Sequence, residues 1–439
     1  MTDVVIIGAG ISGLSCGHFI SKKTNNFLIL ESKDKLGGII QTNIEQNYIC
    51  EYGPNTVLLN NEATKQIISD CNLFERIIYP SINNAKNRFV FNNNKITKIP
   101  LTPIEFIKTS LLSINSKFKL FFEFLVPRHK KNDTVFNFIS KRFGKEFHDK
   151  LVVPFITGIY AGNTKRMSAK HSLKNLWNYE QKYGSITNGI IQNLLRKKSQ
   201  SKSFNFPNGL SELTLKIGEN LKKSIRFNSN VSKIKKTEKG YEISLENEEK
   251  IYCKKLITTV PSYVLMNLID DSTLINELKK IKYNPIDVFH FGLDKKNIKN
   301  KYKGFGVLTK PEDKKKYLGI LFNSDIFNHV SPTNKNLYTV LVGGENQKIL
   351  CKKNIMELQD IISEEIKSLF GYKGEIDFIK NYRWKDGIPQ YTMDQEELIS
   401  AVRGFELKNN NFFITGNYFN GVSVSDCIQK SYEIVKKSF

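Results

Sequence analysis

A short glycine-rich segment near the start of the chain has the residue types and the spacing of a dinucleotide-binding loop. The segment GAGISG (8–13) directly follows the apolar run VVII (4–7) and precedes a helical stretch. In such a loop Gly8 permits a tight turn, Gly10 lets the backbone approach a pyrophosphate, and Gly13 lets helix and strand pack closely. Free N–H groups at the helix start donate to phosphate. The predicted phosphate-binding residues are Gly8, Ala9, Gly10, Ser12 and Gly13.

Two further features extend this site. Glu31 closes a second apolar run, 27–30, and a carboxylate at that distance from the glycines accepts hydrogen bonds from ribose hydroxyls. Gly37 and Gly38 follow after a short loop, and flavoproteins of the amine-oxidase type have a similar glycine pair that approaches the dinucleotide again. The pair shifts the predicted cofactor from NAD to FAD. The alternative is an ordinary glycine turn.

The elements that position these residues form a strand–helix–strand unit over residues 4–30, which is typical of a parallel sheet. The last segment, 410–437, also reads as strand, glycine-containing loop and helix. We therefore predict an α/β fold with a Rossmann-like FAD-binding domain assembled from distant segments. The predicted domains are FAD-binding (1–80, 205–268 and 376–439), an α+β substrate domain (81–98 and 269–375) and a helical membrane-associated domain (99–204).

The pattern between these segments is mixed. Residues 97–150 have a helical period in which phenylalanines recur three and four residues apart among lysines, and 209–223 predicts another amphipathic helix. The stretch 196–203 (RKKSQSKS) is polar and reads as a mobile connection. Short strands are expected after it, and residues 270–375 mix strands with helices.

Charge and composition limit the function classes. The 439 residues carry a formal net charge of +23 and are 40% hydrophobic, which excludes wholesale disorder. A basic excess of this size favours anionic partners such as an acidic membrane surface, a polycarboxylate or nucleic acid. No nucleic-acid module is recognisable, so nucleic acid is not a predicted partner. A lysine-rich, AT-rich coding composition explains the charge equally well.

Cysteine and histidine spacing argue against disulfides and metal. The six cysteines form no CxxC pair and the six histidines form no HExxH motif, so a reducing compartment and no metal site are expected. The chain enters its first strand at once, which leaves no room for a signal peptide, and no apolar run approaches the length of a membrane span. We expect a cytoplasmic protein, with peripheral attachment to the cytoplasmic face of the inner membrane left open.

Further motifs give a specific resemblance over essentially the whole chain. The chain is similar to the protoporphyrinogen oxidases, which are FAD enzymes of haem synthesis in the flavin amine oxidase superfamily, and its motifs fall in the order expected of that family. In place of the more usual Gly-Gly-Arg or Gly-Gly-Lys it has Gly37-Gly38-Ile39. The segments that carry the resemblance are EYGPNTVLLNN (51–61), NRFVFNNNKITKIP (87–100), GIYAGNTKRMS (158–168), YEQKYGSI (179–186), FPNGLSEL (206–213), GFGVLTKPED (304–313), RWKDGIPQY (383–391) and GNYFNGVSVSDCI (416–428).

The resemblance implies a large apolar substrate chamber with a few cations. Arg88 would pair with a propionate, and an arginine can hold a carboxylate through two parallel hydrogen bonds. Phe305 and Leu308 would sandwich a pyrrole ring, and the backbone of Gly158 would line the chamber. Asn55 is the further predicted substrate contact, near the flavin. Without the motifs, each of these residues is more simply a surface, core or turn residue.

Other carried-over residues would contact FAD. Val231 would end a strand and contact adenine through its backbone. Gly416 and Gly421 would allow close backbone approach, and Val422 to Val424 would begin a helix whose N–H groups face the flavin or the pyrophosphate. No side chain is assigned a catalytic role, because hydride would pass directly to flavin N5. We nominate neither Cys427 nor the histidines His18, His171 and His290 as catalytic.

The predicted reaction oxidises protoporphyrinogen IX to protoporphyrin IX, with FAD reoxidised by O2 to give H2O2. The first alternative is a coproporphyrinogen III oxidase, which shares these motifs. Amine oxidases and carotenoid desaturases are less consistent with GFGVL and GIYAG. A carrier of the GDP-dissociation-inhibitor type, without flavin, is the non-enzymatic alternative. Ferrochelatase, an anionic membrane surface and a second copy of the chain are the partners left open.

Overall fold

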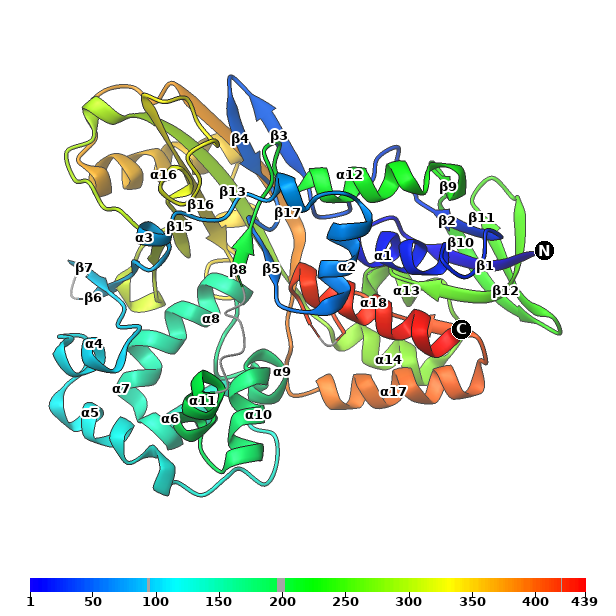
Figure 1. The fold of residues 1–439 in the computed structure, drawn as a ribbon, viewed down its shortest axis with the longest axis horizontal. Coiled ribbons are helices and arrows are strands. Elements are labelled where there is room, and N and C mark those ends of the chain that lie inside the picture. The colour runs from blue at the N-terminus through cyan, green and yellow to red at the C-terminus, as the bar shows by residue number, and fades with distance from the viewer. Residues whose placement is uncertain (93–94, 196–201, 420) are drawn as a thin grey trace.

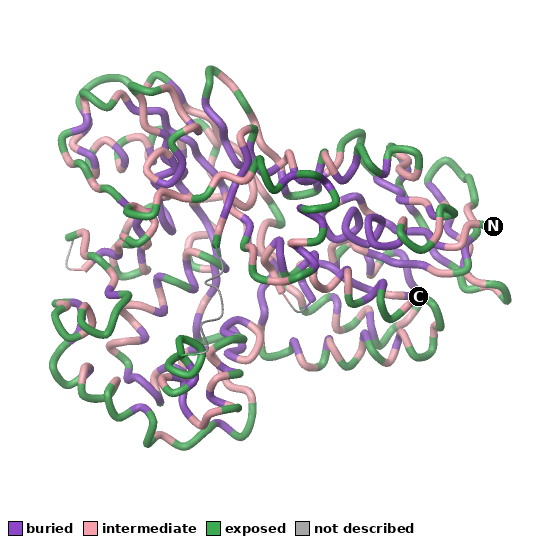
Figure 2. Tube along the Cα trace, viewed as in Figure 1, coloured by how far each residue is buried: buried purple, intermediate pink, exposed green. Residues whose placement is uncertain are grey.

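Three groups of elements make up the protein. The computed structural model describes residues 1–92, 95–195, 202–419 and 421–439. Figure 1 shows an α/β group on the right, a second sheet at the upper left and a group of helices at the lower left. Figure 2 shows that buried residues follow the central strands and the helix faces turned toward them. Each group therefore has its own core.

The first sheet has a parallel centre that distant parts of the sequence supply. β1 pairs in parallel with β2 and with β12. β18 also pairs in parallel with β12, outside the main strand order of the sheet. β10 and β11 extend the sheet in antiparallel fashion. Strands buried on both faces read as continuous apolar runs, which explains VVII and FLIL. The strands are β1 (Thr2–Ile7), β2 (Phe27–Leu30), β9 (Ile225–Arg226), β10 (Val231–Thr237), β11 (Gly240–Leu245), β12 (Lys250–Thr258) and β18 (Phe412–Ile414).

Helices cover both faces of this sheet. Val4 and Ile6 point into one core, and Val5 and Ile7 point into the other, as alternation along a strand requires. The first core is shared with α1 (Ile11–Ile20), α2 (Glu62–Asp70), α12 (Ser211–Asn220) and α18 (Val424–Ser438). The second is shared with α13 (Ser262–Leu265), α14 (Ser272–Lys280) and α17 (Gln395–Lys408). This is the predicted α/β arrangement.

The second sheet is mixed, and α16 covers one of its faces. Its order is β17-β13-β16-β15-β14-β6-β7, with β14 parallel to β6 and the other pairs antiparallel. The strands are β6 (Arg88–Asn92), β7 (Lys95–Lys98), β13 (Tyr283–Asp294), β14 (Gly306–Leu308), β15 (Gly319–Leu321), β16 (Lys335–Gly343) and β17 (Phe378–Pro389). The flanking helices are α3 (Ile82–Ala85), α15 (Asn323–Ile326) and α16 (Ile355–Phe370).

The helical group packs around a small apolar core and a buried ionic cluster. Arg142 is fully buried and pairs with the buried carboxylates of Glu123 and Glu180. Glu180 also accepts from His129 Nδ1 at 2.7 Å. A buried charge is tolerated only when paired in this way. The helices are α4 (Pro103–Lys108), α5 (Ile114–Phe121), the short η2 (Glu123–Leu125), α6 (Val135–Phe143), α7 (Lys145–Phe147), η3 (His148–Val152), α8 (Val153–Tyr160), α9 (Ala169–Ser172), α10 (Lys174–Tyr183) and α11 (Ile186–Leu195).

Two-stranded ribbons connect the groups. β3 (Thr42–Glu45) pairs with β4 (Tyr48–Glu51), and β5 (Val57–Leu59) pairs with β8 (Lys202–Phe204). The second pairing joins residues separated by the whole helical group. The remaining short turns of 3-10 helix are η1 (Phe74–Arg76), η4 (Lys222–Ser224), η5 (Lys295–Asn297), η6 (Pro311–Asp313) and η7 (Leu350–Lys352).

Several predicted elements differ in detail. Of the predicted polar connection 196–203, residues 196–201 lie outside the described residues. Lys202 and Ser203 belong to β8. Val231 begins β10 instead of ending a strand, and the last helix begins at Val424, with Val422 and Ser423 before it. Residues 97 and 98 are strand. β17 lies in the segment 376–439 but pairs with β13 of the second sheet.

Candidate active site

The loop after β1 has the geometry of a phosphate cradle. Gly8 has φ +100°, and a Cβ on Gly13 would lie 1.8 Å from the Gly8 carbonyl oxygen, so both positions exclude a side chain. A Cβ on Gly10 would meet only the Cα of Gly38, at 3.9 Å, so open space lies beside this residue. Within the described residues no side chain caps α1, which leaves its first N–H groups able to donate to an anion.

Glu31 is held at the carboxyl end of β2, beside the glycine loop. Its Oε2 accepts from the Ala9 N–H at 2.8 Å, and its Oε1 accepts from the Lys33 N–H at 3.0 Å. The side chain is buried, yet a carboxylate has about four acceptor positions, so it can still accept from a ligand hydroxyl. This placement fits the predicted contact with a ribose.

The second glycine pair lies on the first. The Gly37 N–H donates to the Ala9 carbonyl at 3.0 Å, and Gly10 and Gly37 form an isolated parallel bridge. Gly37 and Gly38 both have positive φ, at +99° and +59°. Two loops without side chains therefore face the same open space, and the residues present fit a dinucleotide.

Val231 and the C-terminal loop approach the same region from opposite sides. The Ser229 N–H, two residues before Val231, donates to the Glu31 carbonyl at 2.8 Å. On the other side, the Thr415 N–H donates to the Thr258 carbonyl at 3.0 Å, which places Gly416 at the end of β12. Gly416 and Gly421 have φ of +155° and +152°. The structure thus gathers the predicted cofactor residues at one edge of the first sheet.

Tyr391 fixes the loop that joins β18 to α18. Its hydroxyl donates to the Asn417 carbonyl at 2.5 Å and accepts from the Gly421 N–H at 3.0 Å. Gln395 adds a bond to the Tyr418 carbonyl at 3.0 Å. Burial raises the pKa of Tyr391 well above its ordinary value, so the hydroxyl stays protonated and keeps donating.

The face of the second sheet opposite α16 is the candidate substrate surface. Alternate residues such as Val307, Ile320 and Val340 point to α16, so their neighbours point the other way. Strand pairing places these neighbours in two rows. The first row holds Arg88, Gly306, Leu321, Thr339, His290 and Lys380, and the second holds Val90, Leu308, Gly319, Leu341, Val288 and Tyr382.

This face is apolar with one cation at an edge. Leu308, Leu321 and Leu341 are each only half-buried, and neither row contains a carboxylate. Arg88 is exposed as a residue, but desolvation of its guanidinium, which lies 5.0 Å from the centre of the Phe305 ring, lowers the pKa of the group. Lys380, at the opposite edge, is paired with Glu45 at 2.5 Å. The arrangement suits a flat apolar ligand that carries negative charge on one side.

Gly158 on α8 faces the same surface. A Cβ there would lie 2.4 Å from Cδ2 of Leu308, so the helix backbone and Leu308 are in direct contact. The sequence-predicted residues Gly158 and Leu308 therefore meet, as do Arg88 and Phe305.

Asn55 joins the cofactor loops to the substrate sheet. It follows Gly53, where a Cβ would lie 2.0 Å from the carbonyl oxygen of Ile39, next to the second glycine pair. Its side-chain oxygen accepts from Asn323 Nδ2 at 3.0 Å, and Asn323 begins α15 directly after β15. Asn55 thus lies where the two halves of the site meet.

Glu51 pins three segments under this junction. Its Oε1 accepts from the Leu210 N–H at 2.7 Å and from Asn205 Nδ2 at 3.2 Å, and its Oε2 accepts from Thr42 Oγ1 at 2.7 Å. Burial raises the pKa of Glu51 to about 7, against the opposing effect of these hydrogen bonds.

The histidines that we did not nominate have structural partners. His290 is fully buried beside Thr339, and burial lowers its pKa to about 3. His18 contacts Asp70 at 2.8 Å and His171 contacts Glu396 at 2.8 Å, while burial lowers the pKa of both. Cys427 is buried in α18, where burial raises the pKa of its thiol to about 12.

Sequence reasoning missed several residues of this site. Leu321, Leu341 and Thr339 share a face with Arg88 only because of the strand register, and Asn323 and Tyr391 act through loop contacts. The segment LYTVLVG (337–343) is apolar apart from Thr339, so no alternation marked Leu341, and no short-range signal indicated the others.

Comparisons with known proteins agree with this geometry. The family described as flavin containing amine oxidoreductase matches residues 11–434. The mitochondrial protoporphyrinogen oxidase of Nicotiana tabacum is 28% identical, over 97% of this chain and 92% of its own. The coproporphyrinogen III oxidase of Bacillus subtilis (strain 168) is 24% identical, over 97% of this chain and 96% of its own.

A solved structure supports the fold. The Exiguobacterium sp. 255-15 protein, solved under a provisional protoporphyrinogen oxidase name, has a TM-score of 0.85 at 21% identity and covers 99% of this chain and 98% of its own. Among the described residues, no helix has the length and apolar character needed to cross a membrane.

Proposed function

The chain belongs to the flavin-containing amine oxidoreductase family, and from this premise we propose that it is a porphyrinogen oxidase. Its cofactor is FAD, and it is an oxidoreductase. The proposed substrate is protoporphyrinogen IX and the proposed acceptor of the electrons is O2, which leaves as H2O2. Names of relatives that match nearly the whole chain support this assignment.

One observation carries the proposal. Arg88 lies over Phe305 at the edge of an apolar sheet face formed by Leu308, Leu321 and Leu341. A porphyrinogen has the matching chemistry, with an apolar macrocycle and propionates on one side. Arginine holds a carboxylate with two hydrogen bonds, and the leucines pack on pyrrole faces.

The protein's own residues bind, orient and exclude water. FAD, when bound, accepts hydride from the substrate and passes the electrons on. The glycine loops and Glu31 would hold the dinucleotide, and Asn55 would fix the distance between that site and the sheet. Gly158 permits close approach of α8 to Leu308, which narrows the chamber. Neither row of the sheet face contains a carboxylate, and its one histidine, His290, is fully buried, which agrees with a reaction that needs mainly orientation.

The choice between two related substrates follows from charge. Among the described residues Arg88 forms no ion pair, whereas Lys380, the other cation of the two rows, is paired with Glu45. A substrate with carboxylates on one side can pair them with Arg88. The four carboxylates of coproporphyrinogen III would place unpaired negative charges against the leucines of this face, which is unfavourable. Turnover of both porphyrinogens by the same preparation tests this preference. Faster turnover of coproporphyrinogen at equal concentration would favour the alternative function.

Arg88→Ala tests the central contact. The variant is expected to retain FAD and to raise the KM for the porphyrinogen by at least about tenfold, because a charge-assisted contact is worth about 1.5–3 kcal/mol. Arg403→Ala removes an equal charge from the exposed face of α17 and should leave the KM unchanged. An unchanged KM in Arg88→Ala would refute the role of Arg88. Protein that is colourless after incubation with FAD would instead support the carrier alternative.

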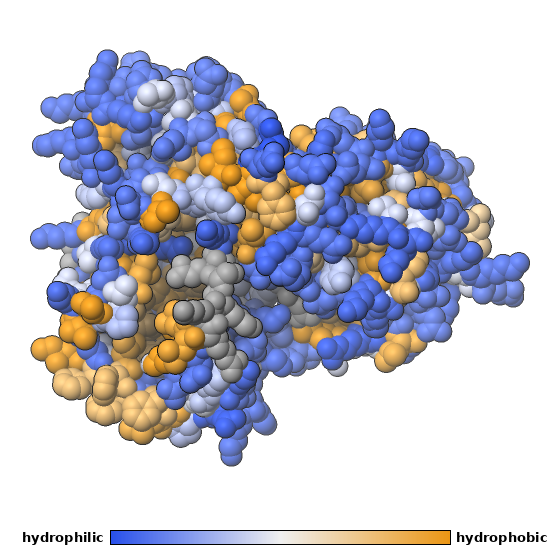
Figure 3. Space-filling view, in the orientation of Figure 1, coloured by the Kyte–Doolittle hydropathy of each residue, from blue (hydrophilic) through white to orange (hydrophobic). Residues whose placement is uncertain are grey.

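Attachment to an anionic membrane is the last part of the proposal. α4, α5 and η2 expose an apolar patch, which we define as Ile104, Ile107, Ile114, Phe118, Phe121, Phe122, Phe124 and Leu125. Figure 3 shows hydrophobic side chains gathered over this part of the molecule, at the lower left. Lys108, Lys117 and Lys119 come from the same two helices. Apolar side chains next to lysines suit the headgroup region of anionic lipid and would receive an apolar substrate there.

A further inference from the structure

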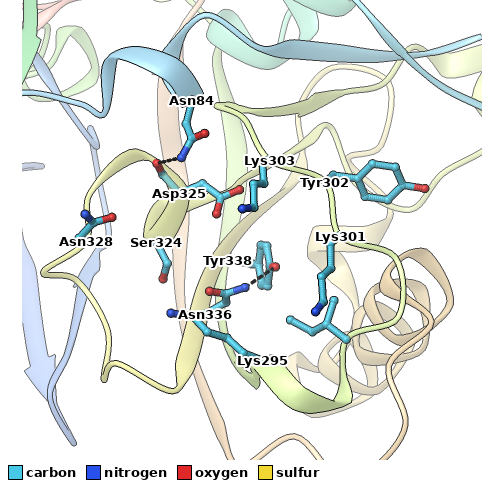
Figure 4. Close-up of a pocket in the computed structure, with 11 residues that line it drawn as sticks. Asn84, Lys295, Lys301, Tyr302, Lys303, Ser324, Asp325, Asn328, Asn336 and Tyr338 are labelled. Atoms are coloured by element: carbon cyan, nitrogen blue, oxygen red, sulfur yellow. Dashed lines mark hydrogen bonds between the residues drawn. The ribbon is translucent and has the colours of Figure 1, made fainter.

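A cavity lies on the side of the second sheet away from the proposed substrate face. It has a volume of about 390 Å³, within the range of small-molecule sites, and it is bounded by the loop before β14, by α15 and by β16. Figure 4 shows Lys301 and Lys303 on the loop, with Tyr302 between them pointing away, and Lys295 entering from another side. Ser324, Asp325, Asn328 and Asn336 supply further polar groups.

The charge of this cavity is positive. Three lysines line it against one carboxylate, that of Asp325. In the described part of the chain, the ammonium groups of Lys295, Lys301 and Lys303 form no ion pair with a carboxylate, although Lys295 donates to the Thr333 carbonyl at 2.7 Å. Neighbouring Lys335 differs, since it pairs with both Asp294 and Asp377. The cavity therefore carries more positive than negative charge, because Lys303 and Lys295 act electrostatically on its one carboxylate, Asp325, and a single carboxylate cannot balance three lysines.

The lining residues also hold the backbone that positions the substrate residues. Asp325 Oδ2 accepts from the Gly304 N–H at 3.2 Å, immediately before Phe305. The Lys303 carbonyl accepts from Asn87 Nδ2 at 3.3 Å, and the Asn87 carbonyl accepts from the Phe305 N–H at 2.7 Å. Asn87 precedes Arg88. Cavity and substrate face thus share the segments that carry Phe305 and Arg88.

We propose that this cavity binds a small polyanion and that its occupancy is coupled to the Arg88–Phe305 wall. The ligand class is a compact molecule with at least two negative charges, of phosphate or carboxylate chemistry, held by Lys295, Lys301 and Lys303. The amides of Asn328 and Asn336 provide hydrogen bonds. Binding itself is independent of the proposed function, whereas the coupling to catalysis rests on it.

Calorimetric titration of the FAD-loaded full chain with inorganic pyrophosphate and with citrate, at constant ionic strength, tests the site. Saturable binding is expected, weakened at least about tenfold in Lys301→Gln/Lys303→Gln because two charge-assisted contacts are lost. Lys222→Gln/Lys223→Gln removes the same charge from an exposed turn of the first group and should bind as the wild type does. Binding of pyrophosphate alone or of citrate alone would identify the ligand chemistry as phosphate or carboxylate.

Asp325→Asn gives a prediction of opposite sign. The amide oxygen still accepts from the Gly304 N–H, but a negative charge leaves the cavity, so pyrophosphate should bind several-fold more tightly. Equal affinity in the wild type and Lys301→Gln/Lys303→Gln, or equal weakening in both double variants, would overturn the site.

Coupling is tested separately. Saturating pyrophosphate should change the porphyrinogen KM of the wild type by at least about threefold and leave that of Lys301→Gln/Lys303→Gln unchanged, since linkage is reciprocal. An unaltered wild-type KM would overturn the coupling. Absence of turnover in any variant would count against the proposed function and not against the anion site, which calorimetry measures directly.

Discussion

Individual glycines set the limits of what this site tolerates. A Cβ on Gly13 would lie 1.8 Å from the Gly8 carbonyl oxygen, whereas no atom of the described residues lies within 4 Å of a Cβ on Gly404 in α17. The two residues lie in helices of the same group and differ only in their surroundings. They therefore make a matched pair for mutation.

Gly13→Ala is expected to lose FAD and to unfold at lower denaturant concentration, because the new methyl must displace the phosphate loop. Gly404→Ala should keep FAD and gain up to about 1 kcal/mol of unfolding free energy from helix propensity. Flavin absorbance per mole of purified protein and urea unfolding measure both effects. Normal flavin content in Gly13→Ala would show that the loop is not the cradle.

Gly158 and Leu308 form a second test at this scale. Gly158→Ala places a methyl 2.4 Å from Leu308 Cδ2, so Leu308 must leave its present position on the proposed substrate face and the porphyrinogen KM should rise about tenfold. Leu308→Ala makes room for that methyl, and the double variant should recover part of the loss. Steady-state kinetics of the four proteins give the coupling energy. Strict additivity would contradict the contact.

Site residues could be predicted from the sequence where the residues that act together lie close together along the chain. Gly8, Gly13 and Glu31 follow one another within a single strand–helix–strand unit, so their spacing alone indicates a dinucleotide. Leu321 and Leu341 could not be predicted in this way, because they enter the site through the pairing of β14, β15 and β16. The roles of Arg88, Phe305, Gly158 and Asn55 came from resemblance and stay predictions.

At the scale of elements, Glu51 ties β4 to β3 and to the turn before α12. Its folded pKa of about 7 lies above the ordinary value of 4.5, so the folded state binds this proton more tightly than the unfolded state does. The stabilisation is therefore complete below about pH 4.5 and is lost as pH rises toward 7.

Glu51→Gln should remove this component of the pH dependence. The amide retains the acceptor for the Leu210 N–H and carries no charge, so it imitates the protonated side chain. Wild-type unfolding free energy should fall by about 3 kcal/mol over that pH window, and the variant should lack this decrease. Urea unfolding at several pH values measures it, and identical pH profiles of the two proteins would contradict the assignment.

The elements themselves were predictable in proportion to their length and locality. Residues 27–30 and the helix after GAGISG agree with β2 and α1 because apolar runs and glycines mark their ends. β14 and β15 have three residues each, too few for a periodic signal. The last helix starts at Val424 because Ser423 caps it by accepting from the Asp426 N–H, a signal that the sequence contained.

At the scale of the whole molecule, the exposed apolar residues of the patch are gathered on one side of the helical group. Buried Glu123 and Arg142 fix η2 from inside, so the neighbouring Phe122 and Phe124 face outward. Ile114 and Phe121 are 74% and 73% exposed, comparable to the isolated Leu407 at 80%. Only the first two lie within a cluster.

Ile114→Ser/Phe121→Ser is expected to reduce binding to vesicles that contain anionic lipid by at least about tenfold, because two large apolar side chains each contribute about 1.5–3 kcal/mol on burial. Leu407→Ser serves as the control and should bind as the wild type does. Co-sedimentation at fixed salt measures the difference. Equal loss in both variants, or wild-type binding by Ile114→Ser/Phe121→Ser, would show that the patch has no special role.

The contact between α18 and α1 constrains how the protein is made. Ser431 of α18 donates to the Ser12 carbonyl of α1 at 2.9 Å, so the first helix of the chain packs against the last. A ribosome that adds about 5–20 residues per second needs tens of seconds to travel between them. During that interval the apolar face of α1 remains exposed in the nascent chain. We therefore expect the chain to depend on chaperones until synthesis is nearly complete.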